Sequence, residues 1–208
     1  MKKLVRILAP VIGVFLLIVL DQWTKFLTIT KLGNLGGASF TETFTTPLAD
    51  VCGVKSVPII DNVLSLTFVQ NQGMAWGLFQ NAQYIFVILT LIAVAVIVYH
   101  YIRAPWEAKF AQVRVIEVLI IGGAFGNLID RVFRGGELFQ GYVVDMIYVE
   151  AINFPVFNVA DSAISIAFVW LIVAMLFVYK EEDFNRLTDV FPRKKSKSEE
   201  SEEKDENN

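Results

Sequence analysis

The stretch Val113–Val132, VRVIEVLIIGGAFGNLIDRV, is mostly apolar and carries Asn127 and Arg131 towards its end. Its length matches the roughly 20 residues that a helix needs to cross a hydrocarbon core. Gly122 and Gly126 lie four residues apart and form a small-residue face on which another helix can pack closely. Asn127 and Arg131 share one helical face at the end of the span. The stretch therefore predicts a closely packed membrane helix with polar side chains at one end.

Three further apolar runs have comparable lengths and cover about Leu4–Ile29, Tyr84–Tyr101 and Ala160–Tyr179. Hydrophobic residues make up 55% of the 208 residues and charged residues 19%, and the apolar residues are gathered in blocks, as in membrane proteins. Lipid offers no partner for open backbone groups, so the spans are expected to be helical. We predict a mainly α, integral membrane fold with four transmembrane helices and a small extracytoplasmic β-rich segment between the first and the second.

Basic residues indicate the orientation of these spans. They gather before the first run, between the second and third, and after the fourth: Lys2, Lys3, Arg6, Arg103, Lys109, Arg114, Lys180, Arg186, Arg193, Lys194, Lys195 and Lys197. Because positive charge favours the cytoplasmic side, both termini are predicted to be cytoplasmic and residues 30–83 and 133–158 to face outward. No small-x-small cleavage site follows the basic start, so we expect an uncleaved first helix. Residues 1–180 would form the membrane-embedded domain, and 181–208 a cytoplasmic tail, disordered from about 194 because it lacks apolar residues there.

The chain has one cysteine and one histidine, which limits its chemistry. An intrachain disulfide and a cysteine metal cluster are impossible, and a histidine-based metal site or catalytic triad is unexpected. Cys52 is interpreted as a loop cysteine, and His100 as an interfacial residue at the inner end of the second span. We therefore expect neither a metal nor another cofactor.

Asp145 and Asp161 lie where apolar segments meet water, at the outer interface. A carboxylate beside lipid is costly, so it is a functional-site hypothesis by default. Two neighbouring carboxylates can share one proton, which leaves one as base and the other as acid. Such a pair could activate water without Ser, Cys or metal. The alternative for Asp161 is a helix cap, formed together with Asn158 three residues earlier.

Three other features have two interpretations each. Asp21 and Lys25 have the spacing of a helical ion pair, which could hold a polar ligand or simply anchor the helix at the interface. The alternating residues 63–69 predict a strand. Asn71 and Gly73 follow as a turn, whose amide could bind peptide backbone or serve the turn alone. Arg131 could bind an anionic lipid head or orient a carboxylate, or it could snorkel to the interface.

Five stretches together resemble the lipoprotein signal peptidase family, also called signal peptidase II, which are bacterial inner-membrane aspartic peptidases. They occur in the family's order over roughly 4–179: Asp21-Gln-Trp-Thr-Lys25, Asn71-Gln-Gly-Met-Ala-Trp76, Gly122-Gly-Ala-Phe-Gly-Asn-Leu-Ile-Asp-Arg131, Val144-Asp145 and Phe157-Asn-Val-Ala-Asp-Ser162. Each motif is weak alone, but five in order are specific. Two features depart from the family: an extra stretch at about 33–58 and the acidic tail.

The resemblance implies that Asp145 and Asp161 are the catalytic pair of an aspartic endopeptidase. They would activate water to cut a diacylglyceryl-modified prolipoprotein just before its lipidated cysteine, at the outer face of the bacterial cytoplasmic membrane. The residues implied to shape the site or bind substrate are Asp21, Lys25, Asn71, Gly73, Asn127, Arg131 and Asn158. Its partners would be lipid-modified prolipoproteins and membrane lipids, with no nucleic acid and no metal, and a monomer is expected.

Two other classes of membrane protein also fit part of the pattern. A small transporter or proton-conducting subunit would place carboxylates in a helical bundle, but more often at mid-membrane and frequently with an inverted repeat, which is not visible here. A non-catalytic scaffold would not require two aspartates without basic partners.

Overall fold

The structure is a computed structural model and describes residues 2–46, 56–73 and 83–190. Several sequence interpretations lie outside the described residues. They concern Cys52, the part of the extra stretch at 47–55, residues 74–76 of the second family motif, and the tail from 194.

Among the described residues, four helices are long and apolar enough to cross a membrane. They are α1 (Lys2–Lys31), α3 (Gln83–Arg103), α4 (Ala111–Phe133) and α5 (Val159–Phe177). Each matches one predicted run to within two residues at either end, which is the usual uncertainty of helix boundaries. The prediction of a mainly helical, multi-pass membrane protein is confirmed.

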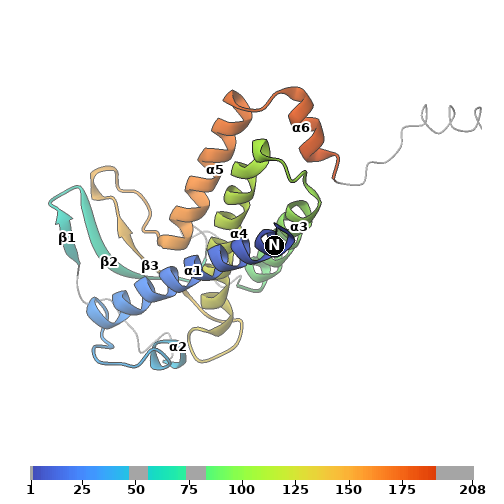
Figure 1. The fold of residues 1–208 in the computed structure, drawn as a ribbon. Helices are drawn as coiled ribbons and strands as arrows, with labels where there is room; N and C mark the ends of the chain where they lie inside the picture. The colour runs from blue at the N-terminus through green and yellow to red at the C-terminus, as the bar shows by residue number, and fades with distance from the viewer. Residues whose placement is uncertain (1, 47–55, 74–82, 191–208) are drawn as a thin grey trace, which may run out of the picture.

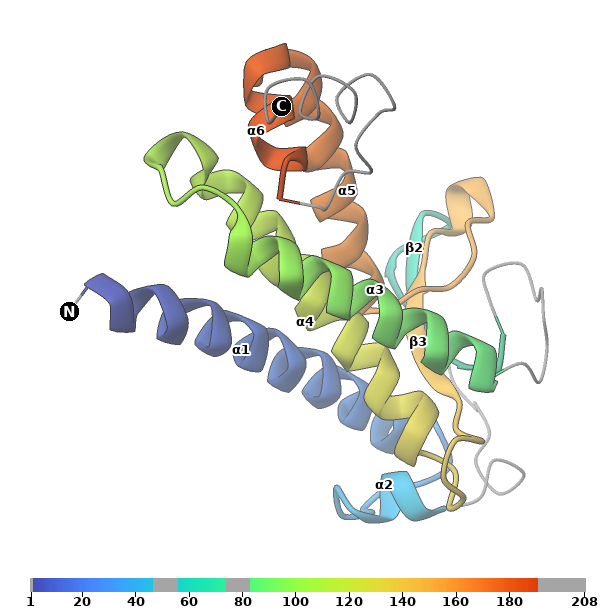
Figure 2. The same cartoon turned by 90° about the vertical axis from the view of Figure 1, so that its right-hand side faces the viewer.

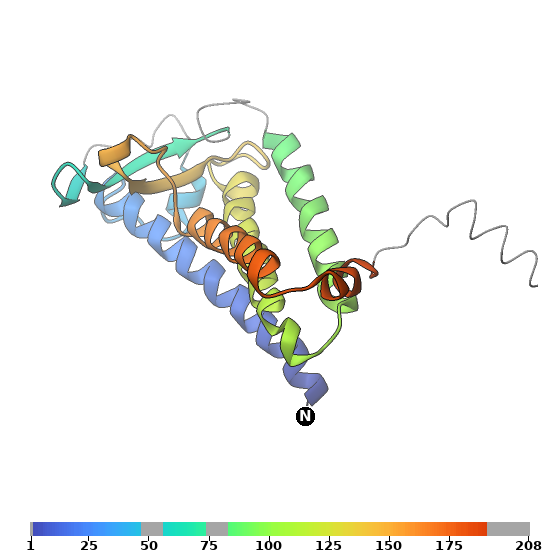
Figure 3. The same cartoon turned by 90° about the horizontal axis from the view of Figure 1, so that it is seen from above.

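The central helix is α4, which packs on α1, α3 and α5 and lies among them in Figure 3. In the most apolar 18-residue stretch of each helix, the buried share is 50% for α4, 22% for α5, and 11% for α1 and α3. Its glycines allow this closeness. A Cβ at Gly122 would lie 2.7 Å from Leu17 of α1, and one at Gly126 would lie 2.6 Å from Asp21 of α1. The predicted small-residue face is therefore the contact surface for α1.

A three-stranded antiparallel sheet lies at one end of the bundle, beside the end of α1 (Figure 1). Its strands, in spatial order, are β1 (Val57–Ile60), β2 (Leu64–Asn71) and β3 (Val143–Tyr148). The strand predicted at 63–69 is β2. The sequence predicted β structure only between the first two spans, and β3 was not predicted. Because β3 comes from the second long loop, the sheet joins both loops into one layer.

Two apolar clusters hold the ends of the molecule together. At the sheet end, Val144 and Met146 of β3 pack with residues from α1 and β2. At the other end, Leu187 packs with Phe110 and Tyr179. Leu187 belongs to α6 (Glu181–Thr188), so the first residues of the expected tail form a helix that packs at the end of α5 opposite the sheet (Figure 2). The described ranges also contain three short helices: α2 (Glu42–Thr45), η3 (Ala108–Phe110) and η4 (Glu150–Ile152).

Candidate active site

Asp145 and Asp161 reach one cavity from different elements. Asp145 lies in β3 opposite Val69 of β2, and Asp161 lies in the first turn of α5. Both line a cavity with a volume of about 1050 Å³, whose walls come mainly from α3, α4 and α5. The fold therefore brings together the two carboxylates that the sequence singled out.

Asp145 is only 2% exposed, and each of its oxygens accepts a hydrogen bond from an amide. Its Oδ1 lies 2.7 Å from Asn158 Nδ2, and its Oδ2 lies 2.9 Å from Asn71 Nδ2. Asn71 is two residues along β2 from Val69, so its side chain is on the same face of the sheet as Asp145. The Oδ1 of Asn71 accepts from the Gly73 N–H at 2.9 Å, and this turn fixes the orientation of the amide.

Asp161 forms a capping box with Asn158 at the start of α5. Asn158 Oδ1 accepts from the Asp161 N–H at 2.9 Å, and Asp161 Oδ2 accepts from the Asn158 N–H at 3.2 Å. The cap considered from the sequence is therefore present, but it does not exclude a pair with Asp145. Asn158 donates from its side-chain nitrogen to the Asp145 carboxylate and from its backbone N–H to the Asp161 carboxylate, so one residue connects both carboxylates.

Asn127 supplies the third amide, from α4. Its Nδ2 donates to Asp161 Oδ1 at 2.7 Å. Its Oδ1 accepts from Lys25 Nζ at 2.9 Å and from Asn158 Nδ2 at 3.1 Å. Because the ammonium of Lys25 can only donate, it forces the oxygen of Asn127 towards itself and the nitrogen towards Asp161.

A cluster of four fully buried charges lies beneath these amides. Lys25 Nζ lies 2.7 Å from Asp21 Oδ2 and 2.9 Å from Asp130 Oδ2. Arg134 Nη2 lies 2.9 Å from Asp130 Oδ1. Two acids and two bases leave no net charge, as burial of charge requires. Asp21 and Lys25 are thus part of a buried network rather than a pair exposed at the interface.

This buried network holds the backbone next to each aspartate of the cavity. Asp21 Oδ1 accepts from the N–H of Ala160 at 3.0 Å, one residue before Asp161. Asp130 Oδ2 accepts from the N–H of Val144 at 3.3 Å, one residue before Asp145. The relative position of the two carboxylates therefore depends on the network.

Asp130 and Arg134 were not among the candidate residues from the sequence. Their signal was an acid four residues before a base at the polar end of the third run, which is the spacing of a helical ion pair. That spacing gave no indication of their contacts with Lys25 and Val144.

Arg131 lies at the polar end of the cavity. Its Nη2 donates to Gly73 O at 3.1 Å, and its guanidinium lies 5.3 Å from the centre of the Phe86 ring. Its Nε is buried and has no hydrogen-bond partner among the described residues. A buried, unsatisfied donor is costly, so this nitrogen marks a place where a ligand can accept a hydrogen bond.

Comparison with known proteins identifies the family. The model of the family described as Signal peptidase (SPase) II matches residues 13–177. The chain belongs to the signal peptidase II family. The lipoprotein signal peptidase of Geobacillus kaustophilus (strain HTA426) is 38% identical over 170 residues, which cover 81% of this chain and 93% of that protein. The one from Halalkalibacterium halodurans is 37% identical over 163 residues, covering 77% and 86%. A solved structure of a bacterial membrane enzyme, obtained by the in meso method, superposes with a TM-score of 0.61 at 25% identity, covering 91% of this chain and 96% of that one.

In this member of the signal peptidase II family, the two carboxylates differ in their surroundings. Burial, and then the negative charge of Asp161, raise the pKa of Asp145 from 3.8 to about 7. Hydrogen bonds from Asn71 and Asn158 act in the opposite direction and only partly offset this. Near neutral pH, Asp145 is therefore often protonated, as an acid in a two-carboxylate site must be.

The nine site residues expected from the sequence lie at three depths relative to the cavity. Those that line the cavity are Asn71, Gly73, Asn127, Arg131, Asp145 and Asp161. Asn158 is buried between the two aspartates. Asp21 and Lys25 lie deepest, with no exposed side-chain surface, so a molecule in the cavity has no direct access to them.

Proposed function

We propose that this chain is an aspartic endopeptidase of the signal peptidase II type, which removes the signal peptide from diacylglyceryl-modified prolipoproteins just before the lipidated cysteine. The observation that carries the proposal is the arrangement of Asp145 and Asp161 at one cavity, joined through Asn158. The relatives, which are named lipoprotein signal peptidases, support the class of substrate.

In the proposed reaction the two aspartates act on a water molecule between them. The water oxygen attacks the carbonyl carbon of the scissile peptide bond, and Asp161 accepts one proton from the water as it does so. Asp145, with its raised pKa, holds the proton that the leaving amine nitrogen needs. When the C–N bond breaks, that proton passes from Asp145 to the amine. The roles of acid and base thus follow from the different surroundings of the two carboxylates.

The cavity fits a lipid-anchored substrate. Its polar end contains the two aspartates, and its walls continue as apolar side chains, among them Phe86 and Ile97 of α3 and Phe168 of α5. A substrate can therefore keep its acyl chains in an apolar environment while the scissile bond reaches the carboxylates. The unpartnered Nε of Arg131 is suited to bind a glyceride carbonyl or a phosphate oxygen of this substrate.

Asp21 and Lys25 have a positioning role in this proposal, in place of the direct substrate contact that the resemblance allowed. Both are fully buried, and they act on the site through the backbone of Ala160 and the side chain of Asn127. Asp130 and Arg134 belong to the same network and have the same role. Their effect is to fix the geometry of the reacting groups before substrate binds.

The proposed orientation places the active site at the outer face of the bacterial cytoplasmic membrane. Basic residues gather at the end of the bundle that contains the first turn of α1 and the α3–α4 connection. The sheet lies at the opposite end (Figure 3), and the two aspartates lie in its strand β3 and in the first turn of α5. In this orientation the site meets the cleavage position of a secreted, lipid-modified precursor. The proposed enzyme works as a monomer and without a metal ion.

The test is cleavage by the purified protein in lipid vesicles. One precursor carries the diacylglyceryl group on its cysteine, and a matched precursor of the same sequence does not. We expect cleavage of the lipidated precursor alone, and mass spectrometry should find the lipidated cysteine at the new N-terminus. Equal cleavage of both precursors would refute the substrate class. An intact lipidated precursor after prolonged incubation would refute the peptidase itself.

A further inference from the structure

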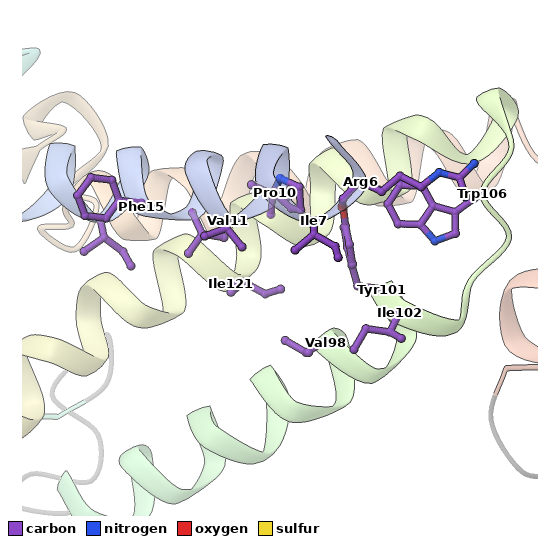
Figure 4. A pocket seen from close by; sticks show the side chains of 13 residues that line it. Arg6, Ile7, Pro10, Val11, Phe15, Val98, Tyr101, Ile102, Trp106 and Ile121 are labelled. Atoms are coloured by element: carbon purple, nitrogen blue, oxygen red, sulfur yellow. The ribbon is translucent and has the colours of Figure 1, made fainter. Parts of the chain in front are cut away.

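A second hollow (Figure 4) lies along the other half of the membrane helices, and it shares no lining residue with the cavity of the two aspartates. It has a volume of about 800 Å³ and is lined by side chains of α1, α3, α4 and the α3–α4 connection. Apart from Arg6 at one end, its lining is apolar or aromatic, with Val11, Phe15 and Ile121 among the residues along its length. Hereafter it is called the α1–α3 groove.

The length of the α1–α3 groove matches one leaflet of a bilayer. Its lining follows α1 from Arg6 to Ile18, which is about 18 Å at a rise of 1.5 Å per residue. A hydrocarbon core is about 30 Å thick, so one leaflet contributes about 15 Å. The lining residues on the other helices, such as Val98 of α3, lie in the same half of the bundle. A second transmembrane helix would need a surface of full membrane length, whereas one acyl chain needs this half alone.

The end of the groove near the start of α1 is cationic. The Arg6 guanidinium lies 4.8 Å from the centre of the Trp106 ring, and the Arg114 guanidinium lies 3.5 Å from the same ring (Figure 4 shows Arg6 beside Trp106). Arg114 donates hydrogen bonds to the backbone carbonyls of Tyr101, Ala104 and Pro105. Arg6, in contrast, forms no ion pair with any described residue and is exposed.

We propose that the α1–α3 groove is a binding site for an anionic phospholipid. One acyl chain lies along α1 as far as Ile18, and the phosphate lies against Arg6 and the indole of Trp106. Arginine forms charge-assisted hydrogen bonds with phosphate, and tryptophan favours the level of the lipid head groups. The acyl chain of an anionic lipid covers the apolar lining of the groove, and its phosphate pairs with Arg6 at the end of the groove. The site is separate from the two aspartates and does not depend on the proposed peptidase activity.

The test measures lipid binding to the purified full-length chain by native mass spectrometry. Phosphatidylglycerol and phosphatidylcholine with identical acyl chains serve as probes. We expect tighter binding of phosphatidylglycerol, and binding about fivefold weaker in Arg6→Gln, since one cation near a lipid surface contributes about 1 kcal/mol. Arg103→Gln is the matched control: Arg103 is at the same end of the bundle and lies over the Tyr99 ring, but it does not line the groove. A second variant, Val11→Trp, fills the groove and should weaken the binding of both lipids.

Three results would overturn the proposal. The first is equal affinity for the two lipids. The second is unchanged binding of phosphatidylglycerol in Arg6→Gln, or an equal loss in Arg103→Gln, which would indicate a general effect of surface charge. The third is a dimer of the wild-type chain that Val11→Trp disrupts, because the groove would then be covered by a second copy. Thermal melting of each variant checks that it folds, and Arg6 and Val11 are exposed side chains whose replacement leaves the core intact.

Discussion

Buried charges lie at both ends of the helix bundle, but the two groups have different partners. At the sheet end, Asp130 and Lys25 bind each other, and the network reaches the residues beside Asp145 and Asp161. At the other end, Arg114 binds backbone carbonyls at the end of α3, and Glu117 binds His100. The charges of the first group position the candidate active site, whereas those of the second satisfy helix ends and connect α3 with α4.

The difference shows why buried charge alone does not locate a functional site. Burial costs both groups desolvation energy, and both need partners. Only the sheet-end group binds the backbone N–H groups next to two carboxylates that share a cavity. The distinguishing feature is therefore the identity of the backbone groups that each buried charge holds.

Removal of a buried charge should have its largest effect on stability and turnover at Asp130, in the sheet-end group. Asp130→Asn leaves Lys25 and Arg134 without their shared carboxylate, so we expect a loss of about 3–5 kcal/mol in the free energy of unfolding. We also expect a lower kcat for the molecules that remain folded. The matched variant at the other end is Glu117→Gln, which should lower stability but leave kcat per folded molecule unchanged. Thermal unfolding in detergent and cleavage of a lipidated precursor measure the two quantities. An equal loss of kcat in both variants would remove the distinction between the two ends.

Asn127→Ala and Arg131→Ala should impair substrate turnover more than folding. The hydrogen bond from Asn127 to the Asp161 carboxylate is worth about 1.5–3 kcal/mol, which corresponds to a loss of about 10- to 100-fold in kcat/KM. Arg131→Ala should act mainly through KM, because Arg131 lines the cavity and its Nε has no hydrogen-bond partner among the described residues. Gln112→Ala, also on α4 but bonded to Trp170 away from the site, is the control and should have unchanged kinetics. Wild-type kinetics in both site variants would mean that neither residue contributes to the site.

The pH dependence should reflect the pKa of about 7 at Asp145. We expect kcat/KM to fall as the pH rises past about 7, because Asp145 then loses the proton that the proposed mechanism transfers to the leaving amine. Between pH 3.8 and about 7 the folded protein holds a proton that the unfolded chain has released, so this carboxyl lowers the free energy of unfolding as pH rises. That decline should be shallower in Asp145→Asn, measured by denaturation at several pH values. An identical pH dependence in both proteins would contradict a raised pKa at this residue.

The smallest effect is expected from removing the tail. Deletion of residues 194–208 should leave cleavage in membranes intact, because the segment has no apolar residue to bury and is predicted to lie across the membrane from the aspartates. Deletion of residues 181–208 should lower the melting temperature, since it also removes the buried Leu187 and the bond from His100 Nε2 to Leu187 O at 3.0 Å. A well-inserted but inactive protein after the shorter deletion would reveal a function for the tail.

The sequence was most informative where a local pattern determines the structure. Length and apolar content predicted the four spans, and alternation predicted β2. The strand β3 was missed because Val143, Val144, Asp145 and Met146 are all buried, so both of its faces are covered and no alternation appears. Strand identity there depends on pairing with β2, which the local sequence does not encode.

The candidate site was predictable in its parts but not in its connections. Asp145, Asp161 and Asn158 stood out as polar residues at the ends of apolar runs. The spacing of Asp21 and Lys25 predicted their ion pair. Asp130, the second partner of Lys25, is however on another helix more than a hundred residues away, and tertiary packing at Gly126 brings the two helices together. Such long-range partners require the fold.

The central claim is that Asp145 and Asp161 together carry out peptide hydrolysis, and the most direct measurement is cleavage of a lipidated precursor by Asp145→Asn and Asp161→Asn. An amide can neither accept the proton of water nor supply one to the leaving amine, so each variant should be inactive while it still inserts and folds. Asp61→Asn, in the exposed turn between β1 and β2, is the matched control and should cleave at the wild-type rate. If either aspartate serves only as a structural partner of Asn158, its variant will be less stable yet still turn over. Substantial cleavage by either purified variant would contradict the claim.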